Sequence, residues 1–403
     1  MKLLNTIYNK IYLSTLRLVS KFVSMPNQIT FAGSGSLEQL CAHITRMGLV
    51  KVLLITDKPL VDLGIAKRVV DSIEACGGEV VIYDGVLPDP TTAMVDVGVR
   101  QFNDNDCDAV LALGGGSSID TAKGVAAAVT NGAIASLVGV MKVKNKVAPL
   151  FAIATTSGTG SEVSVAAVIS DAQTHAKGLI IDVALVPSAI ALDPSVMLGM
   201  PKFVTAATGM DALTHAIETY VSTWANADVK NYSGTAVKLI YKNLPIVFEH
   251  GEDINAREAM ALGSYYAGLS LNISGVGNVH AIAHQLGGKY GIAHGLVNAV
   301  LLPHVLERSH SLMAEGLAEL AELIGVGEDS DSDSVRSLKF IDEVKALNEL
   351  LGMPLGFEQI QYQDMAGLAK DAVNEGRTYP VPELYESIDV IDILKKITLK
   401  PSL

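Results

Sequence analysis

Two pairs of polar side chains at helical spacing are the residues of this chain most able to do chemistry. Asp211 and His215 lie four positions apart in DALTHAIETY, and His280 and His284 have the same spacing in HAIAHQLGGKYGIAH, which also contains His294. Residues at i and i+4 lie over one another on one helix face, so two such pairs and a fifth side chain can surround one ion. Oxygen and nitrogen ligands without cysteine suit Fe, Zn, Co or Ni rather than Ca or Mg.

A single helical histidine is more often an ordinary core or surface residue than a metal ligand. Five ligand-type residues in two short segments of a chain with only 9 histidines shift the interpretation towards a metal site. Spacing alone does not separate the residues that bind the ion from one that merely lies beside it.

A glycine triplet indicates a second site, for a diphosphate. Gly114, Gly115 and Gly116 follow the apolar run AVLAL and precede a helix that we expect to begin near Ser117. Glycines let the backbone approach a ligand closely, and a helix start offers free N–H groups and the positive end of the helix dipole. The segment lacks the third glycine of G-x-G-x-x-G, so an ordinary strand-to-helix turn is the alternative.

Two more polar segments follow predicted strands. The loop TTSGTGSEVS follows PLFAIA, and Asp57 follows VLLIT. Carboxyl ends of parallel strands share one edge of a sheet, so these residues should line one crevice with the glycines. A carboxylate there can accept hydrogen bonds from ribose hydroxyls and would repel a 2′-phosphate, which favours NAD over NADP. Asp57 precedes the glycines instead of following them, which indicates a variant topology; a solvated loop acid is the alternative.

The elements that would position these residues change character along the chain. Apolar runs of strand length alternate with helical patterns in the first half, which predicts a parallel sheet covered on both faces. These runs are 51–56, 79–84, 109–113 and 149–155, and 178–192 reads as one or two more strands broken at Pro187. From about residue 203 the pattern is helical, with Pro245, Pro303 and Pro354 as expected helix ends.

We therefore predict an α/β N-terminal domain with a Rossmann-like parallel sheet of variant topology over 28–200. An all-α, metal-binding C-terminal domain should follow over 201–403. The length of 403 residues agrees with two or three domains.

Composition excludes several classes of protein. A net charge of −13 argues against binding nucleic acid, which requires a basic face. The three scattered cysteines, Cys41, Cys76 and Cys107, are interpreted as free thiols in a reducing cytoplasm. A hydrophobic content of 49% predicts an extensively buried, globular protein.

Residues 1–27 form a separate segment. It carries Lys2, Lys10, Arg17 and Lys21 without an acid, and its apolar residues recur at helical spacing. It lacks the continuous apolar region of a secretory signal and is too interrupted to span a bilayer. A basic amphipathic helix can contact an anionic membrane surface or a partner. Packing on its own protein is the favoured alternative.

Four motifs in order resemble the iron-containing (group III) alcohol dehydrogenases, which include lactaldehyde reductase and 1,3-propanediol dehydrogenase. The motifs are GGGSSIDTAK, TTSGTGSEVS, GMDALTHAIETY and NVHAIAHQLGGKYGIAHGLVNAVLLPHV, and the resemblance covers about residues 28–400. It implies a dinucleotide-binding domain, a helical domain and a metal ion in the cleft between them. It further implies NAD, Fe²⁺ or Zn²⁺, a small alcohol or aldehyde substrate, and a homo-oligomer, a dimer or higher.

The resemblance also implies roles for single residues. Asp211, His215, His280 and His294 match the metal ligands, and His284 matches a residue near substrate and nicotinamide, where an imidazole can relay a proton. The positions that match cofactor contacts are Asp57, Asp89, Gly114, Gly115, Gly116, Ser117, Thr155, Thr156, Thr159 and Lys177. At Asp89 many family members have Asn. The metal would polarise the alcohol oxygen, and hydride would pass to the nicotinamide.

Two other functions compete with this interpretation. A zinc-dependent polyol oxidoreductase resembling glycerol dehydrogenase, or a protein resembling dehydroquinate synthase, would share the architecture. Those relatives usually use Asp or Glu with two His, so the extra imidazole favours the iron group. A non-catalytic, membrane-associated protein should have lost a ligand or the glycine triplet, and this chain retains both. The sequence does not determine which alcohol or aldehyde is the substrate.

Overall fold

The structure is a computed structural model that describes residues 25–174 and 176–399. Two compact units are present among these residues. The sheet unit comprises 25–200 and 252–265, and the helical unit comprises 201–251 and 266–399. Most of the predicted N-terminal basic helix, 1–27, lies outside the described residues. No helix of the described residues is long and apolar enough to cross a membrane.

A six-stranded parallel sheet forms the centre of the sheet unit, with strand order β1-β9-β6-β4-β2-β3. Its strands are β1 (Ile29–Ala32), β2 (Lys51–Ile55), β3 (Glu79–Tyr83), β4 (Ala109–Gly114), β6 (Leu150–Ala154) and β9 (Ala189–Leu192). The predicted parallel sheet is confirmed. Every residue of β4 and β6 is buried, because both strands lie inside the sheet with helices over both faces.

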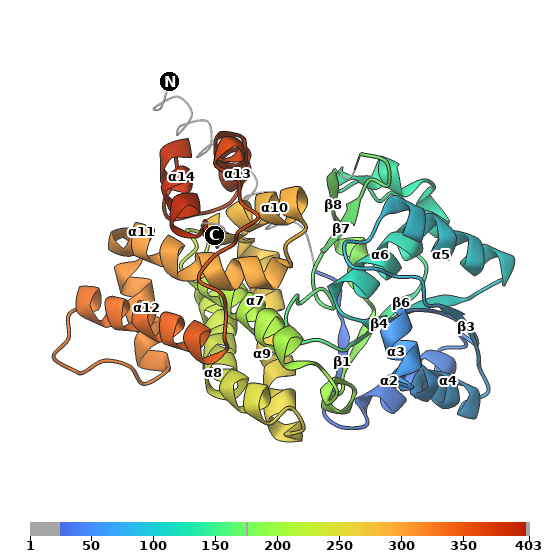
Figure 1. Cartoon of the computed structure of the whole chain (residues 1–403). Coiled ribbons are helices and arrows are strands. Elements are labelled where there is room, and N and C mark those ends of the chain that lie inside the picture. Colours follow the sequence, from blue (N-terminus) through green and yellow to red (C-terminus); the bar gives the residue numbers. More distant parts are fainter. Residues whose placement is uncertain (1–24, 175, 400–403) are drawn as a thin grey trace. The chain divides into compact units, whose positions relative to one another are not determined.

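Helices cover both faces of this sheet, as Figure 1 shows: α2 (Ser36–Arg46) and α4 (Ile65–Ala75) lie on one side, and α5 (Thr92–Asp104) and α6 (Gly116–Asn131) on the other. In α4 the apolar residues Ala66, Val69 and Ile73 recur at helical spacing and are buried. The short helix α3 (Lys58–Asp62) follows β2 directly.

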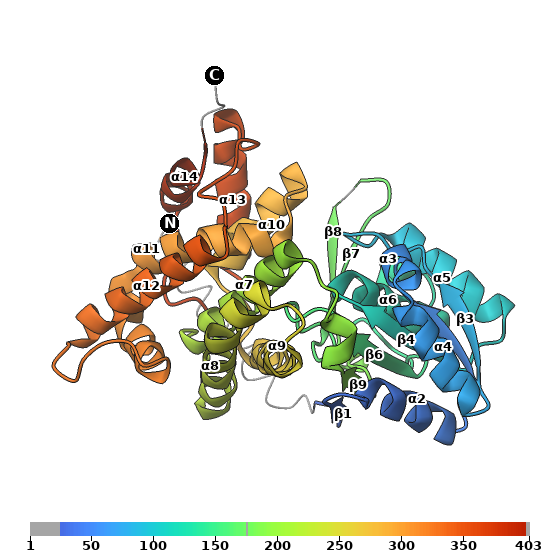
Figure 2. The same cartoon turned by 60° about the horizontal axis from the view of Figure 1, so that its bottom comes forward.

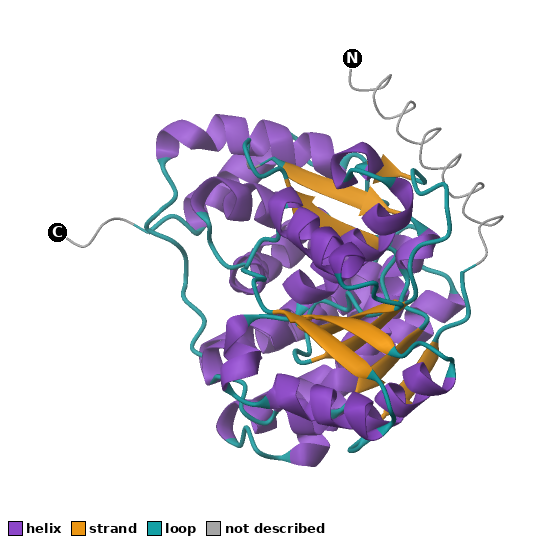
Figure 3. Cartoon of the chain, turned by 90° about the vertical axis from the view of Figure 1, so that its right-hand side faces the viewer, coloured by secondary structure: helices purple, strands orange, loops and turns teal. Residues whose placement is uncertain are grey.

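A second, three-stranded sheet accounts for the other strands. Its order is β5-β8-β7, with β5 (Gly139–Val140), β7 (Ala166–Ser170) and β8 (Lys177–Ile181). Figure 3 shows the strands in two separate groups. The run 178–192 therefore does contain two strands on either side of Pro187, but β8 and β9 belong to different sheets.

The helical unit consists of long helices, which Figure 2 displays from a second direction. They are α7 (Lys202–Tyr220), α8 (Ala227–Glu249), α10 (Asn278–Tyr290), α11 (His294–Leu323), α12 (Asp333–Leu350), α13 (Met365–Gly376) and α14 (Ser387–Lys396). Helix α9 (Ile254–Ser274) begins in the sheet unit and ends in the helical unit. The predicted helical C-terminal half is confirmed.

Two of the expected helix ends are wrong. Pro245 lies inside α8, and Pro303 lies inside α11. An internal proline removes one backbone hydrogen bond and disfavours a helix, but tertiary packing can compensate for this cost. Pro303 is buried within a run of buried residues of α11, which explains why the helix continues there.

Candidate metal and nucleotide sites

Four of the predicted ligands converge in the helical unit. The ligand atoms of Asp211, His215, His280 and His294 all lie within 4.8 Å of one another. Asp211 Oδ1 is 3.9 Å from the Nε2 atom of His215, 3.7 Å from that of His280 and 3.5 Å from that of His294. One carboxylate oxygen thus faces three imidazole nitrogens, a donor set that fits a divalent transition metal.

Asn298 shows how these donor atoms are oriented. Its Nδ2 donates to Asp211 Oδ1 at 2.7 Å and lies 3.1 Å from the Nε2 atoms of both His280 and His294. The Nδ2 group has two protons, so beyond its bond to Asp211 it can donate to one of these imidazole nitrogens, which then presents a lone pair. Such lone pairs are what a metal ion requires, since a ligating histidine is neutral.

Burial and mutual charge shift the titration of this cluster. Burial raises the pKa of the Asp211 carboxyl, but the surrounding imidazoles, His215 first, hold it well below its usual range. Burial lowers the pKa of His280, but the neighbouring Asp211 and Glu218 carboxylates raise it to about 9. Burial lowers the pKa of His294 well below its usual value, which favours the neutral ligand form.

The ligands come from three helices, which must approach closely. Asp211 and His215 belong to α7, His280 to α10, and His294 is the first residue of α11. At the next residue, Gly295, a Cβ would lie 2.3 Å from the Ala207 carbonyl oxygen and 3.3 Å from Asp211 Cβ. Only glycine allows α11 to begin this close to α7.

Glu218 is a site residue that the sequence reasoning missed. Its Oε2 accepts from His280 Nδ1 at 2.6 Å and from Gly277 N at 2.8 Å, and its Oε1 accepts from Val279 N at 2.6 Å. The carboxylate therefore caps the start of α10 and holds the His280 ring with its Nδ1 protonated, leaving Nε2 for a metal ion. Its position one turn beyond His215 could have indicated that it lies on the same helix face.

His284 lies beside the four-residue cluster but outside it. Its ring stacks on His294 with centroids 5.3 Å apart and meets His280 edge-on at 5.9 Å. Its Nδ1 lies 2.5 Å from Glu375 Oε1. The helical spacing to His280 places His284 near the cluster. The contact of its Nδ1 with Glu375 of α13 holds the His284 ring in an orientation different from that of the His280 ring.

Most of the residues predicted to bind the nucleotide lie in the sheet unit at the carboxyl ends of three adjacent strands, β2, β4 and β6, whereas Asp89 follows β3 and Lys177 begins β8. Gly114 ends β4 with a φ of 152°, Gly115 precedes α6, and Gly116 begins it, one residue before Ser117. A Cβ on Gly115 would lie 3.0 Å from Thr156 Oγ1, and one on Gly116 2.9 Å from Thr159 Cγ2. The glycine triplet and the 155–164 loop are therefore in contact, as the shared sheet edge requires.

Thr155 is joined to the glycine triplet through the backbone, because its N–H donates to the Gly114 carbonyl at 3.1 Å. Asp57 follows β2 and caps α3, with Oδ1 accepting from Leu60 N at 3.0 Å. Burial raises the pKa of the Asp57 carboxyl above its usual value.

Asp89 and Lys177 form a pair. Lys177 Nζ is 3.7 Å from Asp89 Oδ1, and Asp89 has a φ of 55°. That left-handed conformation suits Asn and Asp among non-glycine residues, which is a physical reason for either at this position.

A buried cluster holds the 155–164 loop against α6. Lys123 Nζ donates to Ser161 Oγ at 3.2 Å, to the Ser164 carbonyl at 2.8 Å and to the Ala166 carbonyl at 2.7 Å. Asp120 accepts from Ser161 Oγ at 2.5 Å. Burial lowers the pKa of Lys123 to about 8. The cluster links the helix that follows the glycine triplet to the second nucleotide loop.

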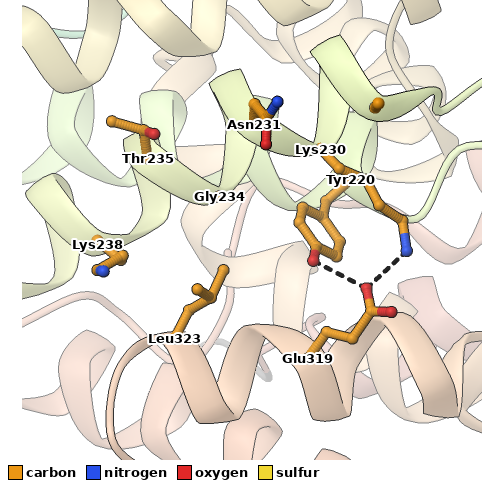
Figure 4. Close-up of a pocket in the computed structure, with 9 residues that line it drawn as sticks. Tyr220, Lys230, Asn231, Gly234, Thr235, Lys238, Glu319 and Leu323 are labelled. Carbon is orange, nitrogen blue, oxygen red and sulfur yellow. Dashed lines mark hydrogen bonds and ion pairs between the residues drawn. The ribbon is translucent and has the colours of Figure 1, made fainter.

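A hollow of about 470 Å³ in the helical unit is lined by none of the predicted site residues. Tyr220 Oη and Lys230 Nζ both donate to Glu319 Oε2, at 2.8 and 2.6 Å, as Figure 4 shows. These polar groups satisfy one another, so the hollow adds nothing to the two sites above.

Known protein families match almost all of the described chain. Residues 26–194 match the family described as iron-containing alcohol dehydrogenase, and residues 205–398 match the C-terminal family of Fe-containing alcohol dehydrogenases. The chain is 37% identical to the NAD-dependent methanol dehydrogenase of Bacillus methanolicus, over 90% of this chain and 96% of that protein. It is 34% identical to the lactaldehyde reductase of Escherichia coli K12, over 91% and 97% of the two chains.

A solved structure matches as well. The crystal structure of a 1,3-propanediol oxidoreductase superimposes with a TM-score of 0.90 at 34% identity, covering 93% of this chain and 98% of the other.

Replacing Glu218 should weaken metal binding. In Glu218→Gln the amide offers one acceptor atom to three N–H donors, so at least one donor faces an NH₂ group. We expect the Kd for Fe²⁺ or Zn²⁺, measured by competition with a chelator, to rise about 10–100-fold. Glu319→Gln, which alters a carboxylate on α11 that accepts from Tyr220 and Lys230, is the matched control. Equal metal affinity in Glu218→Gln and wild type would show that the carboxylate has no part in holding His280.

Proposed function

The chain belongs to the iron-containing alcohol dehydrogenase family, and we propose that it transfers hydride between NAD and a small primary alcohol, diol or the corresponding aldehyde. The observation that carries the proposal is the convergence of Asp211, His215, His280 and His294 on one point. Relatives named for methanol, lactaldehyde and 1,3-propanediol support a small substrate.

These four residues would hold Fe²⁺, or Zn²⁺ in its place. Such an ion supplies Lewis-acid polarisation of the substrate oxygen. Asp211 contributes the one negative charge among the ligands, and the orientation of His280 by Glu218 keeps its Nε2 directed into the cluster. The Irving–Williams order favours Zn²⁺ over Fe²⁺ in a given site, so the donor set alone does not select iron.

His284 is proposed as the residue that accepts the substrate's hydroxyl proton. Its ring lies against His294, and its Nδ1 is held by Glu375, so Nε2 is the nitrogen left to accept a proton. Nε2 would accept this proton during alcohol oxidation and return it during aldehyde reduction.

The nucleotide would bind in the sheet unit. The start of α6 and the glycines before it would hold the diphosphate, with Thr155, Thr156 and Thr159 from the adjacent loop. Asp57 would accept from the ribose hydroxyls, and Lys177 with Asp89 would lie beside the cofactor.

Oligomeric state and compartment complete the proposal. A homo-oligomer, a dimer or higher, is proposed from the resemblance to the family alone. Cys41, Cys76 and Cys107 are free thiols, which supports a reducing cytoplasm. A membrane-surface role for the N-terminal segment is not part of the proposed function.

The proposed activity can be tested directly. Protein reconstituted anaerobically with Fe²⁺, and separately with Zn²⁺, should oxidise members of a panel of small primary alcohols and diols with NAD. Metal-free protein and Asp211→Ala should show no turnover, because the site then lacks its ion or its one charged ligand. Turnover that persists at the wild-type rate in metal-free protein would contradict the proposal.

Removing the charge of Asp57 should weaken the preference for NAD over NADP. Asp57→Asn keeps a cap for α3 but no longer repels a 2′-phosphate. A like charge within about 4 Å costs roughly 1–4 kcal/mol, so the ratio of kcat/KM for NADP to that for NAD should rise about fivefold or more. Asp57→Gly removes both cap and charge and should give the same change with slightly lower stability. Wild-type protein that already uses both nucleotides equally well would contradict this role.

His284 should matter for turnover and not for metal binding. We expect His284→Ala to retain its metal, measured by elemental analysis, while kcat falls about 10²–10⁴-fold. His294→Ala is the comparison, because it should lose the metal. Metal loss in His284→Ala with retention in His294→Ala would mean that the two roles are exchanged.

A further inference from the structure

Glu375 is a carboxylate surrounded by donors next to the metal-ligand cluster. It lies near the end of α13, and its Oε1 is 2.5 Å from His284 Nδ1 and 2.6 Å from Tyr379 Oη. Its Oε2 accepts from Gln285 Nε2 at 2.6 Å. The side chain is about three-quarters buried, with 26% of its surface exposed.

The chemistry of these partners assigns the protons. Gln285 Nε2 and Tyr379 Oη donate, and a carboxylate is acceptor-only when ionised. Burial raises the pKa of Glu375, but the contacts with His284, Tyr379 and Gln285 outweigh burial and lower it. Burial, together with the contact with Glu375, raises the pKa of Tyr379 well above its usual value, so Tyr379 remains a donor. His284 Nδ1 therefore donates to Glu375 Oε1, so in the neutral ring the lone pair is at Nε2.

The backbone is arranged to bring this carboxylate to His284. Gly376 follows Glu375, and a Cβ there would lie 3.1 Å from Asn278 Oδ1 and 3.5 Å from Ala281 Cβ of α10. The glycine allows α13 to lie close against the first turn of α10, whose next turns carry His284 and Gln285. Gln285 Nε2 also donates to the Ala281 carbonyl at 3.1 Å, so the amide that holds Glu375 is itself fixed on α10.

His280 and His284 are therefore positioned by different carboxylates. Glu218 on α7 holds Nδ1 of His280, which belongs to the four-residue cluster. Glu375 on α13 holds Nδ1 of His284, which does not. Each imidazole is held at Nδ1 by its own carboxylate, but only His280 belongs to the four-residue cluster.

We propose that Glu375 is the positioning residue for His284: it retains the Nδ1 proton and fixes the ring so that Nε2 can accept the substrate's hydroxyl proton. Gln285 and Tyr379 hold the carboxylate in place for this purpose. The inference rests on the proposed function, because it assigns Glu375 a role in the proton step proposed for His284. It requires no contact between Glu375 and substrate, nucleotide or metal.

A double-variant cycle tests the inference with kcat as the readout. Glu375→Gln should lower kcat about 10–100-fold, in the range for groups that orient a histidine, while KM changes little. In a His284→Ala background the same substitution should have no further effect on kcat, because Glu375 acts through the imidazole. A structural role for Glu375 would lower kcat by the same factor in both backgrounds, and that result would overturn the inference.

Three further measurements keep the outcomes distinguishable. Metal content, the melting temperature and the Kd for NADH, from nucleotide fluorescence, should match wild type in Glu375→Gln. Asp371→Asn, an exposed position on the same helix, is the matched control and should leave kcat unchanged. If Glu375→Gln does not fold, Glu375→Asp, which keeps the charge on a shorter side chain, takes its place in the cycle.

The outcome also separates this inference from the proposed function. A wild-type protein without alcohol dehydrogenase activity, or a His284→Ala variant with full kcat, would remove the basis of both. Loss of kcat in His284→Ala, with full kcat in Glu375→Gln and in Glu375→Asp, would overturn the role of Glu375 alone.

Discussion

The close approach of α7 and α11 is the constraint on which the metal-ligand cluster depends. With 2.3 Å between a Cβ at position 295 and the Ala207 carbonyl oxygen, any side chain there would push the start of α11 away from α7. His294 would then move away from Asp211, whose Oδ1 lies 3.5 Å from its Nε2. A ligand set built from three helices needs such a contact, because each side chain reaches only a few ångströms from its own backbone.

Carboxylates of the helical unit fix the orientation of two histidines at and beside the cluster. An imidazole that is fixed at one nitrogen presents the other in a known direction and protonation state. Glu218 does this for His280 while also capping α10, so the direction of the ring and the start of its helix depend on one side chain. Removing such a group would leave donors unpaired in a buried environment, which costs more than the loss of an average hydrogen bond.

The sheet unit uses a different principle for its loops. Backbone atoms and small residues at the carboxyl ends of β2, β4 and β6 form the predicted nucleotide surface, and a buried lysine fixes the loop geometry from behind. Lys123 is fully buried, and its hydrogen bonds to loop carbonyls and hydroxyls offset the cost of removing its ammonium group from water. The motif GGGSSIDTAK thus combines a ligand-facing part with a part that supports the neighbouring loop.

Local periodicity determined much of this protein from its sequence. Apolar runs identified β2, β3, β4 and β6, and the i,i+4 spacing placed Asp211 with His215 and His280 with His284, because these patterns reflect contacts within one element. The family was recognisable from four motifs, and the comparisons confirm it.

Tertiary structure alone decided the rest. It joined Glu218 to His280 and Glu375 to His284, pairs that are far apart in the chain, and it gave the two histidines of one helix different partners. It also allowed α8 and α11 to continue past Pro245 and Pro303, where the sequence predicted helix ends. It placed β8 and β9 in separate sheets. Such outcomes depend on packing between elements, and the spacing of residues within one segment contains no information about the partner that another segment will supply.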